Sequence, residues 1–87
     1  MVTSFRINSG ASSTVKGTVT LNNTATNFPI YYMASEDPNF NDGADWLPYS
    51  TAPSFVLSPD SDTKTVYFKL KNGFGESSVV SDTIFLY

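Results

Sequence analysis

The chain of 87 residues is long enough for one domain with a single hydrophobic core and too short for a second domain. It contains neither Cys nor His, which excludes disulfides, Cys-ligated zinc and catalysis by a histidine base. Hydrophobic residues make up 40% of the chain and charged residues only 15%, a balance typical of a folded globular domain.

The charge distribution argues against a nucleic-acid partner. Eight Asp and Glu against five Lys and Arg give a net charge of −3, so phosphate backbones are repelled overall. The basic residues are also scattered along the chain: Arg6, Lys16, Lys64, Lys69 and Lys71. No apolar stretch approaches the roughly 18 residues of a membrane span, and the opening "MVTSFRINSG" lacks the apolar segment of a signal peptide. We therefore expect neither nucleic-acid binding nor membrane insertion.

Short segments rich in Val, Ile, Thr, Phe and Tyr recur between clusters of Ser, Asn, Asp, Gly and Pro, which predicts an all-β fold. In chain order, we expect strands at residues 2–8, 15–22, 28–35, 46–49, 53–58, 64–71 and 79–87. In "KNGFGES", Asn72-Gly73 and Gly75 are suited to the positive φ values of a hairpin loop, which predicts that the last two strands are joined there.

Alternation along the strands predicts which residues form the core. In "KTVYFKLK", lysines 69 and 71 mark one face as exposed to solvent, so the opposite face is predicted to be buried. The residues expected to face inward by the same alternation are Val19, Leu21, Ile30, Tyr32, Ala34, Phe55, Leu57, Val66, Phe68, Leu70, Ile84 and Leu86. An antiparallel sandwich of about seven strands in two sheets buries such faces in a chain of this size.

The stretch "EDPNFNDGADW", residues 36–46, is rich in side-chain oxygens and invites comparison with a calcium loop. Counting from Asp37, the sixth position should be Gly and is Asp42, and the twelfth should be Glu and is Pro48. We therefore expect turns capped by Asp and Asn side chains rather than a metal site. Trp46 is predicted to pack into the core because its ring carries a large apolar area.

The carboxylate pairs Asp60/Asp62 and Asp42/Asp45 are the candidates for acid and base chemistry. Both pairs lie in turn-like sequence, where a carboxyl group stays solvated, whereas a catalytic acid needs a buried, apolar setting. No Ser-x-x-Lys motif occurs, and "GFG" lacks the further glycine and the strand-to-helix context of a nucleotide-binding loop. We predict no catalytic residues, no cofactor and no enzyme activity.

The run "LSPDSDTKTVYFKLKNGFGESS", followed by "VVSDTIFL" and preceded by "DWLPYS", resembles bacterial immunoglobulin-like, fibronectin type III-like modules of secreted and surface proteins. The resemblance is best over residues 30–87 and implies one immunoglobulin-like sandwich over residues 1–87. The chain ends abruptly on the strand-like "DTIFLY", so we expect one module cut from a longer protein. Such modules act as spacers or docking surfaces, so the resemblance implies an extracellular or cell-surface location. The expected partners are neighbouring domains of the same chain or another surface protein.

If the strands at 28–35, 64–71 and 79–87 share a sheet, as the resemblance implies, its outer face is unusually apolar. The outward residues are Tyr31, Met33, Tyr67, Lys69, Lys71, Val79, Phe85 and Tyr87. One interpretation is an interaction surface, for domain docking or, alternatively, for carbohydrate stacked on the aromatic rings. The other is that lysine stems and tyrosine rings simply cover one another.

Overall fold

The computed structural model describes residues 2–87; Met1, the first residue of the predicted domain, lies outside them. Within these residues the strands are β1 (Val2–Ile7), β2 (Ser13–Thr14), β3 (Thr18–Ala25), β4 (Tyr31–Ser35), β5 (Leu47–Pro48), β6 (Ser54–Val56), β7 (Asp62–Asn72), β8 (Gly75–Glu76) and β9 (Val80–Leu86). The prediction of an all-β fold is confirmed. Each of the seven predicted strands overlaps one of these, whereas β2 and β8, of two residues each, were not predicted. In the same range, no helix is long and apolar enough to cross a membrane.

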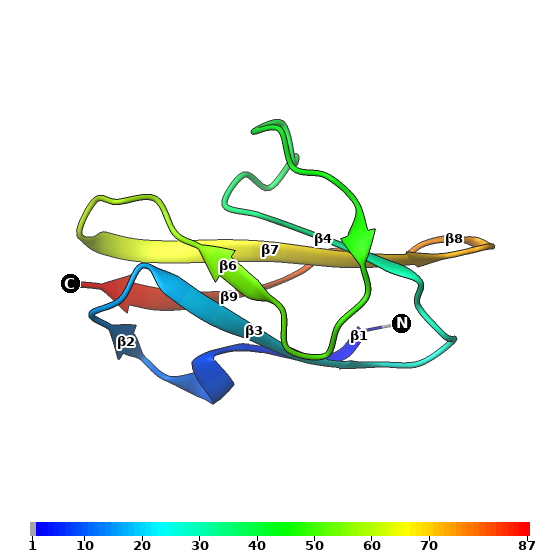
Figure 1. Ribbon diagram of the computed structural model, residues 1–87, viewed down its shortest axis with the longest axis horizontal. Helices are drawn as coiled ribbons and strands as arrows, with labels where there is room; N and C mark the ends of the chain where they lie inside the picture. The colour runs from blue at the N-terminus through cyan, green and yellow to red at the C-terminus, as the bar shows by residue number, and fades with distance from the viewer. Residues whose placement is uncertain (1) are drawn as a thin grey trace.

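The strands form two sheets that face each other (Figure 1). The smaller sheet has the order β1-β3-β6, and the larger has the order β2-β9-β7-β4-β5, with β8 paired to β7. All pairs are antiparallel except the parallel pair of β2 and β9. The prediction that the segments now seen as β4, β7 and β9 share a sheet is confirmed.

The core lies between the sheets, around Phe68. The Phe68 ring stacks on Phe5 with a centroid distance of 4.7 Å and on Tyr32 with a centroid distance of 5.8 Å. The predicted core residues that are buried are Val19, Leu21, Tyr32, Leu57, Val66, Phe68, Leu70, Ile84 and Leu86. Ala34 and Phe55 are half-buried. Ile30 is 52% exposed, so its prediction was wrong: it lies just before β4, outside the strand whose inward residues are buried.

One inward position of β7 holds a lysine. Lys64 alternates with Val66 and is only 6% exposed. Its Nζ donates to Ser58 Oγ at 2.7 Å, and Ser58 Oγ donates to Glu36 Oε1 at 3.1 Å. The hydrogen bonds thus run from a cation through a hydroxyl to a carboxylate, which is how a buried charge is compensated.

The chain crosses from one sheet to the other between β1 and β2. The short 3₁₀ turn at Asn8–Gly10 has φ values of 49°, 58° and 94° at Asn8, Ser9 and Gly10. Left-handed backbone is disfavoured outside Gly, Asn and Asp, and hydrogen bonds to β3 hold it here. Asn8 Oδ1 accepts from Thr20 N–H at 2.8 Å, and Ser9 N–H donates to Asn22 Oδ1 at 2.8 Å. This turn places β1 in the smaller sheet and β2 in the larger one.

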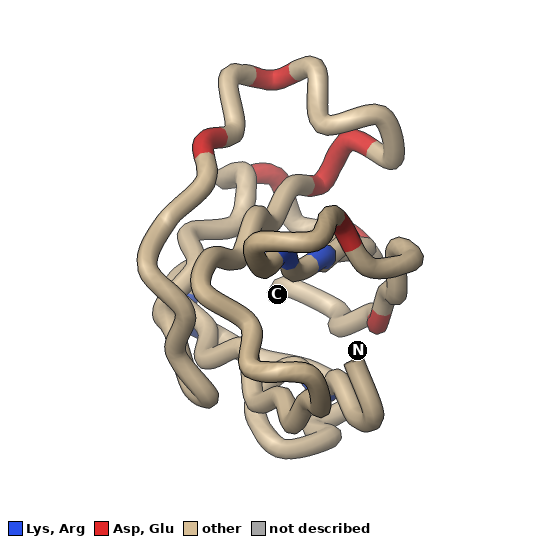
Figure 2. The backbone as a smooth tube through the Cα atoms, turned by 90° about the vertical axis from the view of Figure 1, so that its right-hand side faces the viewer, with Lys and Arg blue, Asp and Glu red and all other residues tan. Residues whose placement is uncertain are grey.

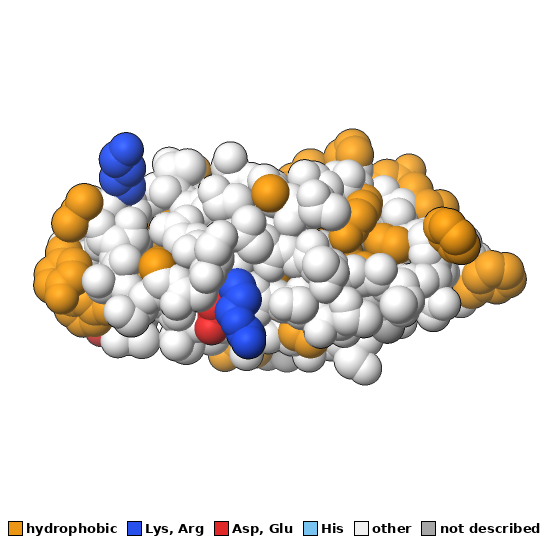
Figure 3. All heavy atoms as spheres, turned by 90° about the horizontal axis from the view of Figure 1, so that it is seen from below, with side chains coloured by type: hydrophobic (Ala, Val, Ile, Leu, Met, Phe, Trp, Pro, Cys, Tyr) orange, Lys and Arg blue, Asp and Glu red, His pale blue; other side chains and the backbone are white. Residues whose placement is uncertain are grey.

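The molecule is elongated, with extents of 39 × 25 × 18 Å. Figure 1 shows the C-terminus at one end of the long axis, whereas β1 begins towards the other end, near the β7–β8 hairpin. Figure 3, which views the molecule from the side of the smaller sheet, shows a largely polar middle and hydrophobic side chains gathered at both ends.

Candidate interaction surface

The segment between β4 and β5, residues 36–46, folds over the face of the larger sheet that points away from the core (Figure 1). We call this side the outer face and the segment the covering loop. Ser35 has the outward parity of β4 yet is 0% exposed. Its Oγ donates to Asp42 Oδ2 at 2.7 Å and accepts from Asp37 N–H at 2.8 Å. These bonds anchor the covering loop to β4.

Within the covering loop, Asp37 organises the backbone. Its carboxylate accepts from Asn39 N–H at 2.9 Å and from Asn41 N–H at 3.1 Å, and its carbonyl accepts from Phe40 N–H at 3.0 Å. Gly43 has φ of 87°, as a turn at Asp42-Gly43 requires. The predicted turns and Asp caps are confirmed. Among residues 2–87, no three His, Cys, Asp or Glu side chains are grouped so that they could hold a metal ion.

Lysines and aromatic rings attach the covering loop to β7. Lys69 Nζ lies 4.6 Å from the centroid of the Phe40 ring and 5.3 Å from that of Trp46. Lys71 Nζ lies 4.5 Å from the Trp46 centroid and 5.4 Å from that of Tyr31. Contacts of this kind contribute about 0.5 to 1 kcal/mol each when partly exposed. Trp46 is therefore half-buried on the outer face, and the prediction that it belongs to the core was wrong.

The charges of the two layers are complementary. Figure 2 shows acidic residues along the loop at the top and basic residues below it. The strand under the covering loop, β7, contains Lys69 and Lys71. Lys69 also forms an ion pair with Glu76 of β8, at 3.0 Å. The Lys69 amine thus contacts both a carboxylate and aromatic ring faces. The covering loop packs on β7 through such contacts and has no apolar core of its own.

The residues predicted to form an interaction face do point outward, but they are unequally accessible. Tyr31 is 41% exposed, Phe85 36% and Tyr87 69%. Tyr67, Lys69 and Lys71 are half-buried. Met33 is only 9% exposed because it lies in the part of the face that the covering loop overlies. The exposed part of the face is thus divided between its two ends, and whether it binds anything stays a prediction.

Two phenylalanines that were not predicted as site residues are highly exposed at one end of the molecule. Phe28, between β3 and β4, is 93% exposed, and Phe74, at the β7–β8 turn, is 101% exposed. Asn72 joins the two loops, since its Nδ2 donates to Asn27 O at 2.9 Å while its Oδ1 accepts from Phe74 N–H at 2.8 Å. We call Phe28 and Phe74 the aromatic end. The exposure of Phe74 could have been predicted from the sequence, because a Phe flanked by glycines at a hairpin tip has nothing to pack against.

The carboxylate pairs considered for acid and base chemistry lie at the surface. Asp60, Asp62, Asp42 and Asp45 are all exposed. Asp42 is already engaged by the Ser35 hydroxyl, and Asp62 accepts from Thr63 N–H at 2.7 Å. The hydrogen bonds of Asp42 and Asp62 therefore stabilise a turn and the start of a strand.

Comparisons with protein-family models, with curated proteins and with solved structures each give no match.

Proposed function

We propose that this protein is a non-catalytic, immunoglobulin-like or fibronectin type III-like module that spaces and docks domains in a bacterial secreted or cell-surface protein. The strand order supports the assignment: β1, β3 and β6 lie in one sheet and β9, β7, β4 and β5 in the other. Immunoglobulin-like sandwiches distribute their strands between two antiparallel sheets in this alternating way. The parallel pairing of β2 with β9 fits a first strand divided between the two sheets.

The observation that carries the proposal is the position of the exposed apolar side chains. The aromatic end lies where β1 begins, while Phe85 and Tyr87 lie where the chain leaves, at the opposite end of a 39 Å body (Figure 1). Phe85 and Tyr87 pack edge to face with centroids 4.9 Å apart. Exposed apolar clusters at chain entry and exit are what an adjoining domain buries in an elongated array.

The hydrogen bonds of Ser58 and Lys64, a hydroxyl beside an amine, support a non-catalytic role. Ser58 and Lys64 are hydrogen-bonded, but Lys64 donates to the hydroxyl and the hydroxyl donates to Glu36. A general base must instead accept the serine proton. This arrangement gives the buried Lys64 amine a hydrogen-bond acceptor and does not activate a nucleophile.

The test is hydrogen exchange on the chain with its natural neighbouring domains and on the isolated domain. We expect backbone amides around Phe28 and Phe74, or around Phe85 and Tyr87, to exchange more slowly when neighbours are present. Serine substitutions at Phe28 and Phe74 should remove the difference at that end, while Val56→Ser, which changes another exposed apolar residue, serves as the matched control. Equal exchange rates at both ends with and without neighbours would rule out docking.

A carbohydrate-binding module is the second candidate, favoured by the outward rings of Tyr31 and Trp46 beside the polar covering loop. Against it, Lys71 Nζ already lies over both rings, 5.4 Å from the Tyr31 centroid and 4.5 Å from the Trp46 centroid. A saturable chemical-shift change at Tyr31 and Tyr67 on adding oligosaccharides, lost in Tyr31→Ala with the fold intact, would favour this candidate over the spacer.

A further inference from the structure

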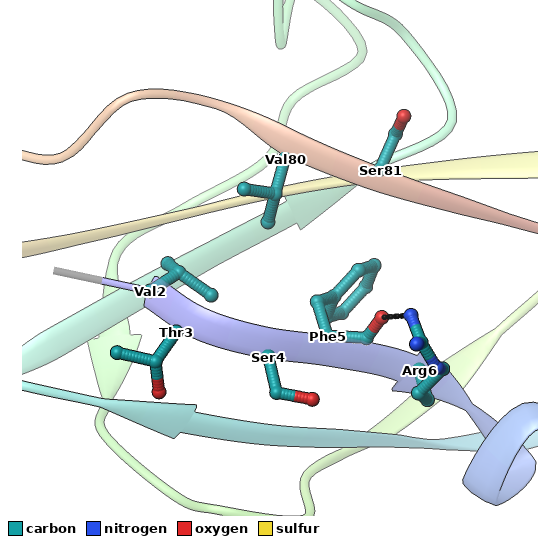
Figure 4. Close-up of a pocket in the computed structure, with 7 residues that line it drawn as sticks. All are labelled: Val2, Thr3, Ser4, Phe5, Arg6, Val80 and Ser81. Atoms are coloured by element: carbon teal, nitrogen blue, oxygen red, sulfur yellow. Dashed lines mark hydrogen bonds between the residues drawn. The ribbon is translucent and has the colours of Figure 1, made fainter.

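The two sheets leave an open seam between the edges of β1 and β9. Figure 4 shows the two strands side by side with a hollow between them, lined by Val2, Thr3, Ser4, Phe5, Arg6, Val80 and Ser81. The hollow has a volume of about 230 Å³. Val80 and Phe5 point into it, whereas Ser81 points away. Two apolar side chains thus face each other across a hollow whose lining also holds Thr3, Ser4 and Arg6.

The backbone of β9 is only partly paired along this edge. Phe85 N–H donates to Ser12 O and Tyr87 N–H to Thr14 O, both at 3.0 Å, so the N–H and C=O groups of odd-numbered residues point towards β2. Alternate residues of a strand direct these groups to the same edge, so those of Ser81 and Thr83 point there as well. Yet β2 pairs with β9 only at Phe85 and Leu86. Within residues 2–87, Ser81 and Thr83 thus have no strand partner on that side, and both are exposed.

The facing edge of β1 is blocked by side chains. Ile7 N–H donates to Asp82 Oδ2 at 2.9 Å, and Phe5 O accepts from Arg6 Nη1 at 3.4 Å. An inward-pointing carboxylate and a basic side chain are common devices that keep a strand edge from pairing. The Asp82 carboxylate extends from β9 towards β1 and engages the β1 edge, while the main-chain groups of Ser81 and Thr83 on the β9 edge have no strand partner among residues 2–87. This part of β9 is therefore where a strand can still be added.

From this geometry we infer that the β9 edge from Val80 to Ile84 binds an extended segment of another polypeptide by strand addition. Ser81 and Thr83 supply the main-chain hydrogen bonds, and the hollow receives one aliphatic side chain of the added strand. Among residues 2–87, Arg6 is the one charged residue that lines the hollow, and its bond to Phe5 O is long, so it selects a segment with an acidic residue.

A second copy of this chain is the less suitable occupant. Two β9 edges related by a two-fold axis bring their Arg6 side chains to the same seam. The other sheet edges are short: β5 has two residues including Pro48, and β6 has three residues between Pro53 and Pro59. Proline lacks the N–H that a ladder needs.

The first measurement is amide hydrogen exchange in the chain alone. Ser81 and Thr83 amides should exchange quickly, whereas those of Asp82 and Ile84, which face β7, should be protected. Slow exchange at Ser81 and Thr83 in the absence of any peptide, accompanied by a concentration-dependent dimer, would overturn the inference in favour of self-pairing.

The second measurement identifies the occupant with a displayed library of random dodecapeptides, selected on the wild-type chain and counter-selected on Thr83→Pro. Thr83→Ala, which keeps the backbone N–H, is the matched control and should retain binding. With a selected peptide at about ten times its Kd, Ser81 and Thr83 amides should exchange about tenfold more slowly, because only the free fraction exchanges.

Arg6→Glu should reverse the charge preference of the selected peptides from acidic to basic. Should Thr83→Pro fail to fold, peptides N-methylated at alternate residues replace it, and methylation on the side facing β9 should abolish binding. Failure to enrich any peptide, or binders that leave both amides exchanging as before, would overturn the inference. These measurements concern only the β9 edge. They are therefore independent of the test of domain docking at the two ends of the molecule.

Discussion

Asp82 Oδ2 accepts the backbone N–H of Ile7 at 2.9 Å, joining strands of different sheets across 75 positions of sequence. Asp82 occupies an inward position of β9, opposite Val66, while Ile7 is fully buried on β1. A carboxylate thus replaces the strand partner that the edge of β1 lacks, and it fixes how the two sheets meet at the seam.

We expect Asp82→Ala to lower the free energy of unfolding by about 1 to 3 kcal/mol, because it leaves the Ile7 N–H without its acceptor. Asp82→Asn retains an oxygen at this position and should cost less. Urea unfolding followed by circular dichroism measures both. If the alanine variant matched the wild type, water would be serving the Ile7 N–H equally well.

Phe68 and Trp46 should differ sharply on truncation. Phe68→Ala should cost about 3 to 5 kcal/mol, since its ring is 0% exposed and stacked between Phe5 and Tyr32. Trp46→Ala should cost only about 1 to 2 kcal/mol, because it removes a half-buried ring and its contacts with two lysines. Urea unfolding measures both losses of free energy. Equal losses for the two variants would contradict the position of Trp46 outside the core.

The buried amide of Asn23 should be hard to replace. Its Nδ2 donates to Leu21 O at 3.1 Å and to Ser50 O at 3.0 Å, and its Oδ1 accepts from Tyr49 Oη at 2.9 Å. Asn23→Ala should destabilise the fold by about 1 to 3 kcal/mol because it removes all three hydrogen bonds of a buried amide. Tyr49→Phe removes one of the bonds and should cost less, so a double-mutant cycle yields the coupling between the two.

Stability should fall at high pH. Burial raises the pKa of Tyr32 and of Tyr49 above the ordinary value of 10.0. Because the folded-state pKa is higher, the unfolded chain loses these protons first, so the contribution is complete below about pH 10 and is lost as pH rises through the folded pKa. Unfolding free energies measured between pH 8 and 11 should decrease towards pH 11, and Tyr49→Phe should weaken that decrease. A rise above pH 10 would contradict the sign.

Millimolar calcium or a chelator should leave Tm unchanged. The oxygens of Asp37 already accept two backbone N–H bonds, and Asp42 is held by Ser35, so a complete ligand set is not available in the covering loop. Asp37→Ala should lower Tm equally with and without calcium, while the exposed Asp45→Ala serves as the control. A rise of several degrees on adding calcium would show that the loop rearranges to bind the ion.

The sequence predicted the two-sheet fold well because alternation is a local signal. Val66, Phe68 and Leu70 follow it, and their burial needs no knowledge of the partner strands. The predicted burial of Ile30 and of Trp46 was wrong for another reason. Each side chain is apolar, but whether it is buried depends on which other segment of the chain packs against it. Trp46 packs on two lysines of β7 whose sequence pattern only marked the face as solvated.

The surface could be predicted less completely. The outward direction of Tyr31, Phe85 and Tyr87 was readable from parity, but the burial of Met33 and Ser35 depends on a loop folding back over its own strand. The seam escaped prediction entirely. It exists because residues Asn8–Gly10 turn with left-handed backbone, so that the first strand leaves one sheet for the other.

The parallel pairing of β2 with β9 also determines how the module responds to tension between its ends. A force that draws the C-terminus away from the start of β1 pulls β9 forward and, through the Asn8–Gly10 turn, pulls β2 backward (Figure 1). The bonds Phe85 N–H to Ser12 O and Tyr87 N–H to Thr14 O then lie across the direction of sliding and are strained together. Breaking these bonds together by shear needs a larger force than breaking them one at a time. The short strand β2 therefore raises the force needed to separate the two ends of the module.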